Sequence, residues 1–158
     1  MEHTTYLLTG SNVGDAARNI EIAFTHIQQT GRISRQSSVY LTEPWGNKNQ
    51  NAFLNQVLEL LTEFSPLELM QELLRIEQEM GRKRTQKWEP RIIDIDILFF
   101  DDLIIEGELI IPHPLLHERR FTLEPLFELT PDFVHPFLKL SVRDLLEQCK
   151  DEGKVNKL

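Results

Sequence analysis

The stretch that most constrains the fold is WEPRIIDIDILFF, residues 88–100. Its second half alternates between two sets of side chains: Ile93, Ile95, Ile97 and Phe99 on one side, and Asp94, Asp96, Leu98 and Phe100 on the other. Because successive side chains of a strand point to opposite faces, this period of two predicts a β-strand. We expect the isoleucine side to lie in a hydrophobic core, so the opposite side brings two carboxylates to one face of a sheet.

Asp94 and Asp96 are candidate metal ligands. Residues two apart in a strand lie roughly 6.5–7 Å apart at Cα, so their carboxylates can reach the same small volume. Two anions this close repel each other unless a positive charge lies between them, and hard carboxylate oxygens suit Mg²⁺ bound to nucleotide phosphates. The alternative is a solvated strand face whose charges discourage aggregation. The D-x-D pattern alone leaves both interpretations open.

Charge limits the classes of ligand. The 158 residues carry a formal net charge of −8, which argues against a general nucleic-acid binder. Basic residues are nevertheless concentrated in one short segment, at Arg82, Lys83, Arg84, Lys87 and Arg91. An acidic chain with one basic segment is typical of a protein that holds a small polyanionic ligand locally.

Composition also bears on location and size. No apolar run approaches the roughly 20 residues that span a bilayer, and the start of the chain, MEHTTYLLTG, lacks the features of a signal peptide. Cys149 is the single cysteine, so we expect neither an internal disulfide nor a cysteine-based zinc site. We therefore expect a cytoplasmic protein without a membrane partner. It should form one domain over residues 1–158, with a frayed tail from about residue 150.

The rest of the chain predicts an α+β fold around this strand. Runs rich in β-branched and aromatic residues predict three more strands, at 4–9, 33–41 and 53–61. Asp15 and Ser65 are predicted to cap two helices, and the second has Pro at its first position and Glu at its third, as in a capping box. The resulting βαββαβ order is that of ferredoxin-like folds. A hairpin partner at 103–105, a short strand at 109–111, and short helices at 123–129 and after Ser141 complete the prediction.

Three further features have both a structural and a functional interpretation. Glu77 falls on or beside the apolar stripe of the second helix, where a carboxylate needs a partner or a ligand unless it reaches water. His113 and His117 have the i, i+4 spacing of zinc ligands, but Pro114 and the lack of a suitable third ligand nearby argue against zinc. The turn that starts at Gly10 lacks the spacing of a phosphate-binding loop.

Taken in order, these features resemble one family. The motifs are GSN at 10–12, TEPWG at 42–46, FLN at 53–55, Glu77, GRxR at 81–84, WEPRxxDxD at 88–96, PHP at 112–114 and RRF at 119–121. The pattern is similar to that of the 6-hydroxymethyl-7,8-dihydropterin pyrophosphokinases of folate biosynthesis. The resemblance runs from about Tyr6 to Phe137, and the combination of PRxxDxDxL with PHP is its most specific part.

The resemblance implies an ATP-dependent transferase. A pyrophosphoryl group would pass from ATP to the hydroxymethyl oxygen of the pterin, giving AMP and the pterin diphosphate. It also implies a ferredoxin-like α+β core and two Mg²⁺ ions, both held by Asp94 and Asp96. Its small-molecule substrates would be ATP and hydroxymethyldihydropterin, and we expect a monomer.

The same resemblance assigns roles to individual residues. Catalysis is assigned to Arg82, Arg91, Asp94 and Asp96. ATP binding is assigned to Glu77, Arg82, Arg84, the backbone of Ile97, His113 and Arg119. Pterin binding is assigned to Gly10, Thr42, Pro44, Trp45, Asn55 and the two stacking rings, Phe53 and Phe121. The chain departs from some members at Phe53, Lys87 and Pro114, which leaves the individual roles of Arg84, Lys87 and Pro114 open.

Two rival classes make different predictions. A nucleotidyltransferase also joins a Gly-Ser turn to a D-x-D strand, but there the two motifs lie close in sequence, whereas some eighty residues separate Ser11 from Asp94 here. A ferredoxin-like regulatory or RNA-binding module would need solvent-facing aromatic residues on the sheet and a basic surface. The acidic balance and the aspartate pair oppose that second alternative.

Overall fold

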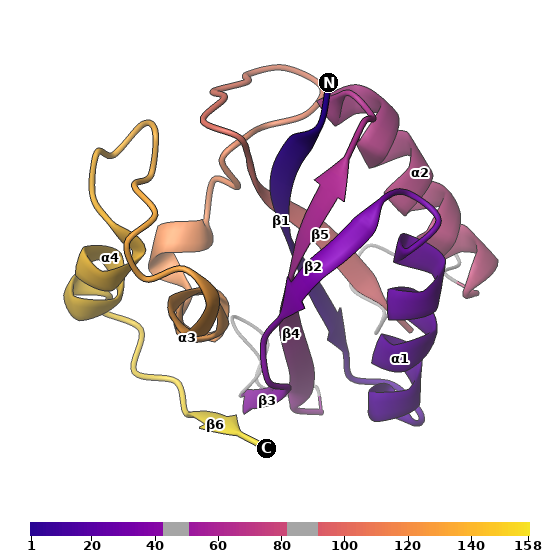
Figure 1. Ribbon diagram of the computed structural model, residues 1–158. Coiled ribbons are helices and arrows are strands. Elements are labelled where there is room, and N and C mark those ends of the chain that lie inside the picture. The colour runs from indigo at the N-terminus through magenta and orange to yellow at the C-terminus, as the bar shows by residue number, and fades with distance from the viewer. Residues whose placement is uncertain (43–50, 82–91) are drawn as a thin grey trace.

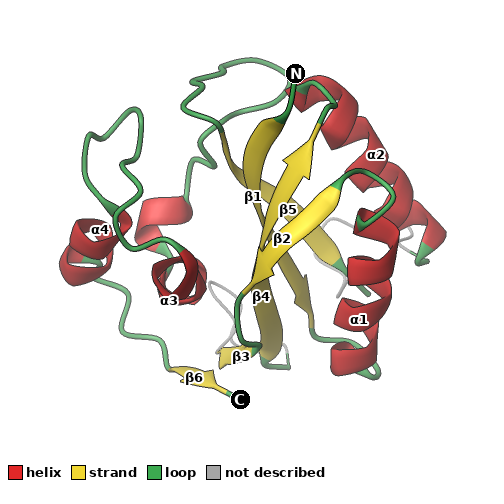
Figure 2. Ribbon diagram, viewed as in Figure 1, coloured by secondary structure: helices red, strands yellow, loops and turns green. Residues whose placement is uncertain are grey.

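The computed structural model describes residues 1–42, 51–81 and 92–158 (Figure 1). Its strands are β1 (His3–Ser11), β2 (Arg32–Gln36), β3 (Tyr40–Thr42), β4 (Phe53–Thr62), β5 (Asp94–Phe100) and β6 (Val155–Lys157). Its helices are α1 (Ala16–Ile27), α2 (Pro66–Glu79), the 3-10 turn η1 (Leu116–Glu118), α3 (Arg120–Leu129) and α4 (Val142–Gln148). The predicted α+β class is confirmed (Figure 2).

The strands form one antiparallel sheet with the order β5-β1-β4-β3-β6, and β2 also pairs with β4. Helices α1 and α2 cover one face of this sheet, and α3 and α4 lie on the other (Figure 1). Two separate clusters of buried side chains result, one on each face. We call these the α1/α2 face and the α3/α4 face.

The two long helices begin where the sequence predicts. The Asp15 side chain accepts a hydrogen bond from the backbone N–H of Arg18 at 3.2 Å. Ser65 and Glu68 form both bonds of the capping box, in which each side chain accepts from the other residue's backbone N–H. These local bonds satisfy backbone donors that the first helical turn leaves without partners, so the cap residues determine the helix start.

The predicted faces of β5 are correct as far as Leu98. Tyr6 of β1 pairs with Phe99 and Leu7 pairs with Ile97, so Leu98 is an extra residue in the ladder. Such a bulge shifts the alternation by one residue. Phe99 therefore packs on the α3/α4 face beside Leu98, and Phe100 packs on the α1/α2 face with the isoleucines, the reverse of the sequence-based prediction.

Four other expectations need correction. Residues 33–41, predicted as one strand, form the two strands β2 and β3. Between them Ser37 bonds to Val57 of β4: its backbone N–H donates to the Val57 carbonyl, and its hydroxyl accepts from the Val57 N–H. The segments predicted at 103–105 and 109–111 meet only in an isolated bridge between Ile105 and Ile111. Helix α3 begins at Arg120 and includes Pro125. The tail expected to be frayed contains β6, which pairs with β3.

Within the described ranges, the helices are too short or too polar for any of them to cross a membrane.

Candidate active site

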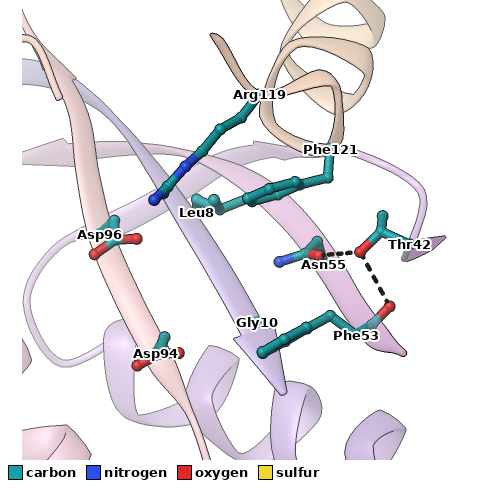
Figure 3. Close-up of a pocket in the computed structure, with 9 residues that line it drawn as sticks. All are labelled: Leu8, Gly10, Thr42, Phe53, Asn55, Asp94, Asp96, Arg119 and Phe121. Atoms are coloured by element: carbon teal, nitrogen blue, oxygen red, sulfur yellow. Dashed lines mark hydrogen bonds between the residues drawn. The ribbon is translucent and has the colours of Figure 1, made fainter. Parts of the chain in front are cut away.

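The two aspartates lie on the α3/α4 face of β5, as the alternation predicts. Asp94 pairs with Gly10 of β1, and Asp96 pairs with Leu8. Both side chains are half-buried. Arg119, which precedes α3, extends its guanidinium toward Asp96 (Figure 3). Strand β5 and the start of α3 thus bring opposite charges together across the sheet surface.

Arg119 lies in a poorly solvated position. Burial lowers the pKa of its guanidinium, and the nearby carboxylates of Asp96, Glu118 and Asp94 act in the opposite direction. Its Cζ also lies 5.4 Å from the ring centroid of Phe121. A half-buried arginine beside acidic side chains has a charge that is already partly balanced.

A hollow of about 170 Å³ opens beside these charges. We call it the aromatic hollow; its lining residues are Leu8, Gly10, Thr42, Phe53, Asn55, Asp94, Asp96, Arg119 and Phe121. The rings of Phe53 and Phe121 lie on opposite sides of it and are both seen edge-on in Figure 3. The Thr42 hydroxyl donates to Asn55 Oδ1 at 2.9 Å, and the Asn55 amide nitrogen points into the hollow. A flat ring with polar edges suits this arrangement.

Gly10 allows the backbone of β1 to approach this hollow closely. A Cβ atom at Gly10 would lie 2.5 Å from the Asn55 amide nitrogen. That nitrogen is not free to move without cost, because the other atom of the same amide accepts from Thr42. The glycine therefore leaves room for the Asn55 side chain on the paired strand.

A second hollow, of about 280 Å³, lies between α2, β5 and the 109–113 segment. We call it the aliphatic hollow; its lining residues are Met70, Leu73, Leu74, Glu77, Ile95, Asp96, Ile97, Leu109, Ile110 and His113. Asp96 lines both hollows. The two hollows therefore meet at a carboxylate, which is the layout that a transfer between two bound molecules requires.

His113 is an uncharged hydrogen-bonding group at neutral pH. Burial lowers the pKa of its imidazole to about 4, and the positive charge of Arg119 adds to that effect. Its Nδ1 lies 3.2 Å from the backbone nitrogen of Leu115 and accepts from that N–H. The proton of the neutral ring is consequently on Nε2, which leaves one donor for a ligand.

Glu77 has a backbone partner that the sequence could not reveal. Its side chain is only 4% exposed, and Oε2 accepts from the backbone N–H of Ile95 at 2.8 Å. This bond ties α2 to β5 at the residue between the two aspartates. The sequence-based alternative in which Glu77 reaches water is wrong.

The structure thus gathers most of the predicted site residues, eight in the aromatic hollow and three more, Glu77, Ile97 and His113, in the aliphatic hollow. Pro44, Trp45, Arg82, Arg84 and Arg91 lie outside the described residues. Leu8 and the apolar lining of the aliphatic hollow were not predicted, because apolar side chains carry no signal that separates a ligand contact from a core contact.

Comparison with known proteins identifies the family. A family model described as 7,8-dihydro-6-hydroxymethylpterin-pyrophosphokinase matches residues 6–131. The 2-amino-4-hydroxy-6-hydroxymethyldihydropteridine pyrophosphokinase of Aquifex aeolicus is 41% identical over 142 residues, which cover 89% of each chain. The protein of the same name from Bacillus subtilis is 40% identical over 132 residues, which cover 82% of this chain and 79% of the relative.

Solved structures support the same assignment at the level of the fold. The crystal structure of wild-type HPPK-DHPS from Plasmodium falciparum superimposes with a TM-score of 0.76 and 19% identity. The match covers 94% of this chain but only 44% of that larger protein. The family model and the bacterial relatives together cover most of the sequence. The chain therefore belongs to the 7,8-dihydro-6-hydroxymethylpterin-pyrophosphokinase family.

Proposed function

We propose that the family's reaction takes place where the aromatic and aliphatic hollows meet at Asp96. That reaction transfers a pyrophosphoryl group from ATP to the hydroxymethyl oxygen of 6-hydroxymethyl-7,8-dihydropterin, a step of folate biosynthesis. The observation that carries the proposal is the position of Asp96, which lines an aromatic cavity on one side and a largely aliphatic cavity on the other.

The aromatic hollow would hold the pterin. Phe53 and Phe121 offer two ring faces for a flat bicyclic molecule, and such stacking favours aromatic ligands beyond their buried area. The Asn55 amide nitrogen would donate to an acceptor on the ring edge, and the Thr42 hydroxyl fixes its orientation. The hydroxymethyl group would then point toward Asp94 and Asp96, which lie at the other side of the hollow (Figure 3).

The aliphatic hollow would hold the nucleoside part of ATP. Leu73, Leu74 and Ile110 supply apolar contact for a purine, and the edge of β5 supplies the backbone of Ile97. His113 lies at the same hollow and would donate its Nε2–H to a phosphate oxygen. The phosphates would extend toward Asp96, where the second substrate is bound.

The residues present suit Mg²⁺ bound together with a nucleotide. Among residues 1–42, 51–81 and 92–158 no group of three or more His, Cys, Asp or Glu side chains forms a complete metal site. Mg²⁺ is ordinarily held by one or two carboxylates together with substrate phosphates, so a pair of aspartates suffices once ATP is present. We propose that Asp94 and Asp96 hold two such ions, which would neutralise charge on the transferred group.

The other residues would position the substrates and balance their charge. Phosphoryl transfer depends mainly on alignment and electrostatic stabilisation, because the protein supplies little covalent chemistry. Arg119 would compensate the phosphate charge and at the same time pack against Phe121. The catalytic roles of Arg82 and Arg91 remain predictions from the family resemblance, as do the binding roles of Arg84, Pro44 and Trp45.

The proposal also includes the type of core, the oligomeric state and the location in the cell. The order β5-β1-β4-β3 supports a ferredoxin-like core, extended by β6 at the β3 edge. The monomeric state and the cytoplasmic location stay predictions, and gel filtration and cell fractionation would measure them.

One assay distinguishes this function from the two rivals. The chain is incubated with ATP, Mg²⁺ and 6-hydroxymethyl-7,8-dihydropterin, and the nucleotide product is identified by chromatography. We expect AMP together with a pterin diphosphate in equal amounts. ADP would indicate single phosphoryl transfer, free pyrophosphate with a nucleotidylated pterin would indicate a nucleotidyltransferase, and the absence of turnover would favour a binding module.

A further inference from the structure

The last segment of the chain connects two walls of the aromatic hollow. We call residues 151–158 the tail. From the end of α4 the tail passes alongside α3 and ends as β6 beside β3 (Figure 1). Helix α3 carries Phe121 and strand β3 carries Thr42, and both residues line the aromatic hollow.

At its first residue the tail bonds to the start of α3. Asp151 Oδ2 accepts from the backbone N–H of Arg120 at 3.2 Å, and the Asp151 carbonyl accepts from the Arg120 Nε at 2.9 Å. Arg120 lies between the two hollow-lining residues Arg119 and Phe121. Asp151 therefore fixes the backbone from which both of those side chains extend.

At its other end the tail pairs with β3. Val155 pairs with Thr42 and Lys157 pairs with Tyr40. The backbone N–H of Leu158 extends the contact by donating to the Val39 carbonyl at 2.9 Å. Strand β3 is only three residues long, and a strand this short has little stability without neighbours on both edges. The tail supplies the second edge, and β4 supplies the first.

Helix α3 contacts the same strand through Glu128. Its carboxylate accepts from the Tyr40 hydroxyl at 2.6 Å and from the Ser38 backbone N–H at 2.9 Å, and it lies 3.7 Å from the Lys157 Nζ. The tail, α3 and β3 thus form a closed set of contacts around one side of the hollow. Loss of any member leaves the others able to shift relative to Asn55, whose position depends on Thr42.

We propose that the tail is a positioning element of the pterin site, which holds Phe121 and Thr42 at the spacing that a stacked pterin requires. This inference rests on the proposed function of the aromatic hollow and adds a segment to that site. The bonds of the tail run to α3, to β3 and to Val39, away from α2 and the 109–113 segment, so its loss should affect the pterin and spare the nucleotide.

The test compares three variants with the wild-type chain. The first is shortened to end at Lys154, which removes β6. The second is Asp151→Ala, which removes the acceptor for the Arg120 N–H. The control is Lys154→Ala, which changes an exposed residue of the same tail. Calorimetry measures the Kd of a non-hydrolysable ATP analogue with Mg²⁺, and then the Kd of the pterin for enzyme saturated with that analogue.

We expect the pterin Kd of the shortened chain to rise at least about tenfold, because a displaced Phe121 or Thr42 weakens both the ring stacking and the ring-edge hydrogen bond. Asp151→Ala should act in the same direction with a smaller effect. The Kd of the ATP analogue should stay within about twofold in every variant, and Lys154→Ala should match the wild type in both measurements.

Three results would overturn the inference. One is an unchanged pterin Kd in the shortened chain, and another is an equal loss of affinity for both ligands, which would indicate a general structural defect. If circular dichroism shows that the shortened chain is unfolded, the same comparison is made with Asp151→Ala. The third result is then a wild-type pterin affinity in Asp151→Ala, which would also reject the inference. Failure of the wild-type chain itself to bind the pterin is a different result, since it would reject the proposed function of the hollow.

Discussion

The two faces of the sheet are built from the same strands but carry different residues at one end of those strands. On the α1/α2 face, side chains such as Leu7, Leu60 and Ile95 stay apolar and buried along the sheet. On the α3/α4 face, Tyr6, Leu98 and Phe99 form a similar apolar cluster at one end only. Toward the other end the same alternating positions hold Asp94, Asp96, Gly10 and Asn55. One face is a core except at the β5 edge, where Ile95 and Ile97 line the aliphatic hollow, and the other is a core that turns into the aromatic hollow.

The difference between the two faces explains why the candidate site lies at one end of the α3/α4 face. A carboxylate in a closed core costs several kcal/mol unless it is hydrogen-bonded, as Glu77 is to the Ile95 N–H, so charged residues are otherwise found where a sheet face is left uncovered or where a ligand neutralises them. Gly10 pairs with Asn55 on one side and with Asp94 on the other, so a single row across three strands supplies both the ring-edge contact and the metal ligand. Substitutions on the two faces should therefore affect different properties.

The largest effect is expected for Asp96→Ala. The loss of a ligand shared by both hollows should lower kcat by about a thousandfold, which corresponds to about 4 kcal/mol of transition-state stabilisation. The free energy of unfolding should stay near the wild-type value, because a half-buried acid contributes little to the core. Steady-state assays and urea unfolding measure the two quantities, with the exposed Asp102→Ala as the matched control. A near-normal kcat would remove Asp96 from the mechanism.

The converse effect is expected on the α1/α2 face. Leu60→Ala removes a fully buried side chain, which should lower the free energy of unfolding by about 3 kcal/mol. The kcat per folded molecule should change little, since Leu60 lines neither hollow. Leu67→Ala is the control, because that leucine is 42% exposed and its truncation should cost less than about 1 kcal/mol. A large loss of kcat in folded Leu60→Ala would show that the two faces are not independent.

A smaller effect is expected where the two strands approach most closely. In Gly10→Ala the new methyl group must displace the Asn55 amide, so one hydrogen bond to the pterin edge should be lost. That loss is worth about 1–2 kcal/mol, or about a tenfold rise in the pterin Kd. Gly107→Ala is the control, because a Cβ there meets no atom within 4 Å among the described residues. Equal pterin affinity in both variants would argue against a role for Asn55.

The smallest effect concerns pH and again belongs to the α3/α4 face. Burial lowers the pKa of His135 to about 4, and the charge of His117 adds to that effect. An unfolded histidine titrates near 6.5, so between about pH 6.5 and pH 4 the unfolded chain takes up a proton that the folded chain does not, and stability falls with falling pH.

Between pH 7 and pH 5 the His135 contribution should be on the order of 1 kcal/mol, since partial solvent screening reduces it. His135 Nδ1 accepts from the backbone N–H groups of Phe137 and Leu138. His135→Asn retains a nearby acceptor but cannot titrate, so its unfolding free energy should depend less steeply on pH. The same slope as in the wild type would mean that other groups cause the acid sensitivity.

Local signals predicted the elements that local bonds determine. Asp15 and the Ser65–Glu68 pair gave correct helix starts, because a cap is a bond between neighbours in sequence. Alternation placed Asp94 and Asp96 on the correct face of β5, because the direction of each side chain follows from the local geometry of the strand. It failed at Phe99 and Phe100, beyond the bulge at Leu98, because a large apolar side chain suits either face and nothing in the pattern marks the extra residue of a bulge.

The parts that could not be predicted depend on distant partners. A polar tail forms β6 only because β3 presents an unpaired edge, and that edge is created by the fold of the preceding residues. The Asp151–Arg120 contact joins residues 31 apart, and the bond from Ile95 to Glu77 joins residues 18 apart. Recognition of the site depended on the family resemblance, since neither the D-x-D pair nor the turn at Gly10 is specific alone.

A crystal structure with a non-hydrolysable ATP analogue, Mg²⁺ and the pterin would test the central claim most directly. We expect Mg²⁺ within about 2.0–2.1 Å of carboxylate oxygens of both Asp94 and Asp96, with phosphate oxygens completing the octahedral coordination. The pterin should lie between Phe53 and Phe121. Carboxylates turned into solvent with no cation bound, while both substrates occupy the hollows, would contradict the account.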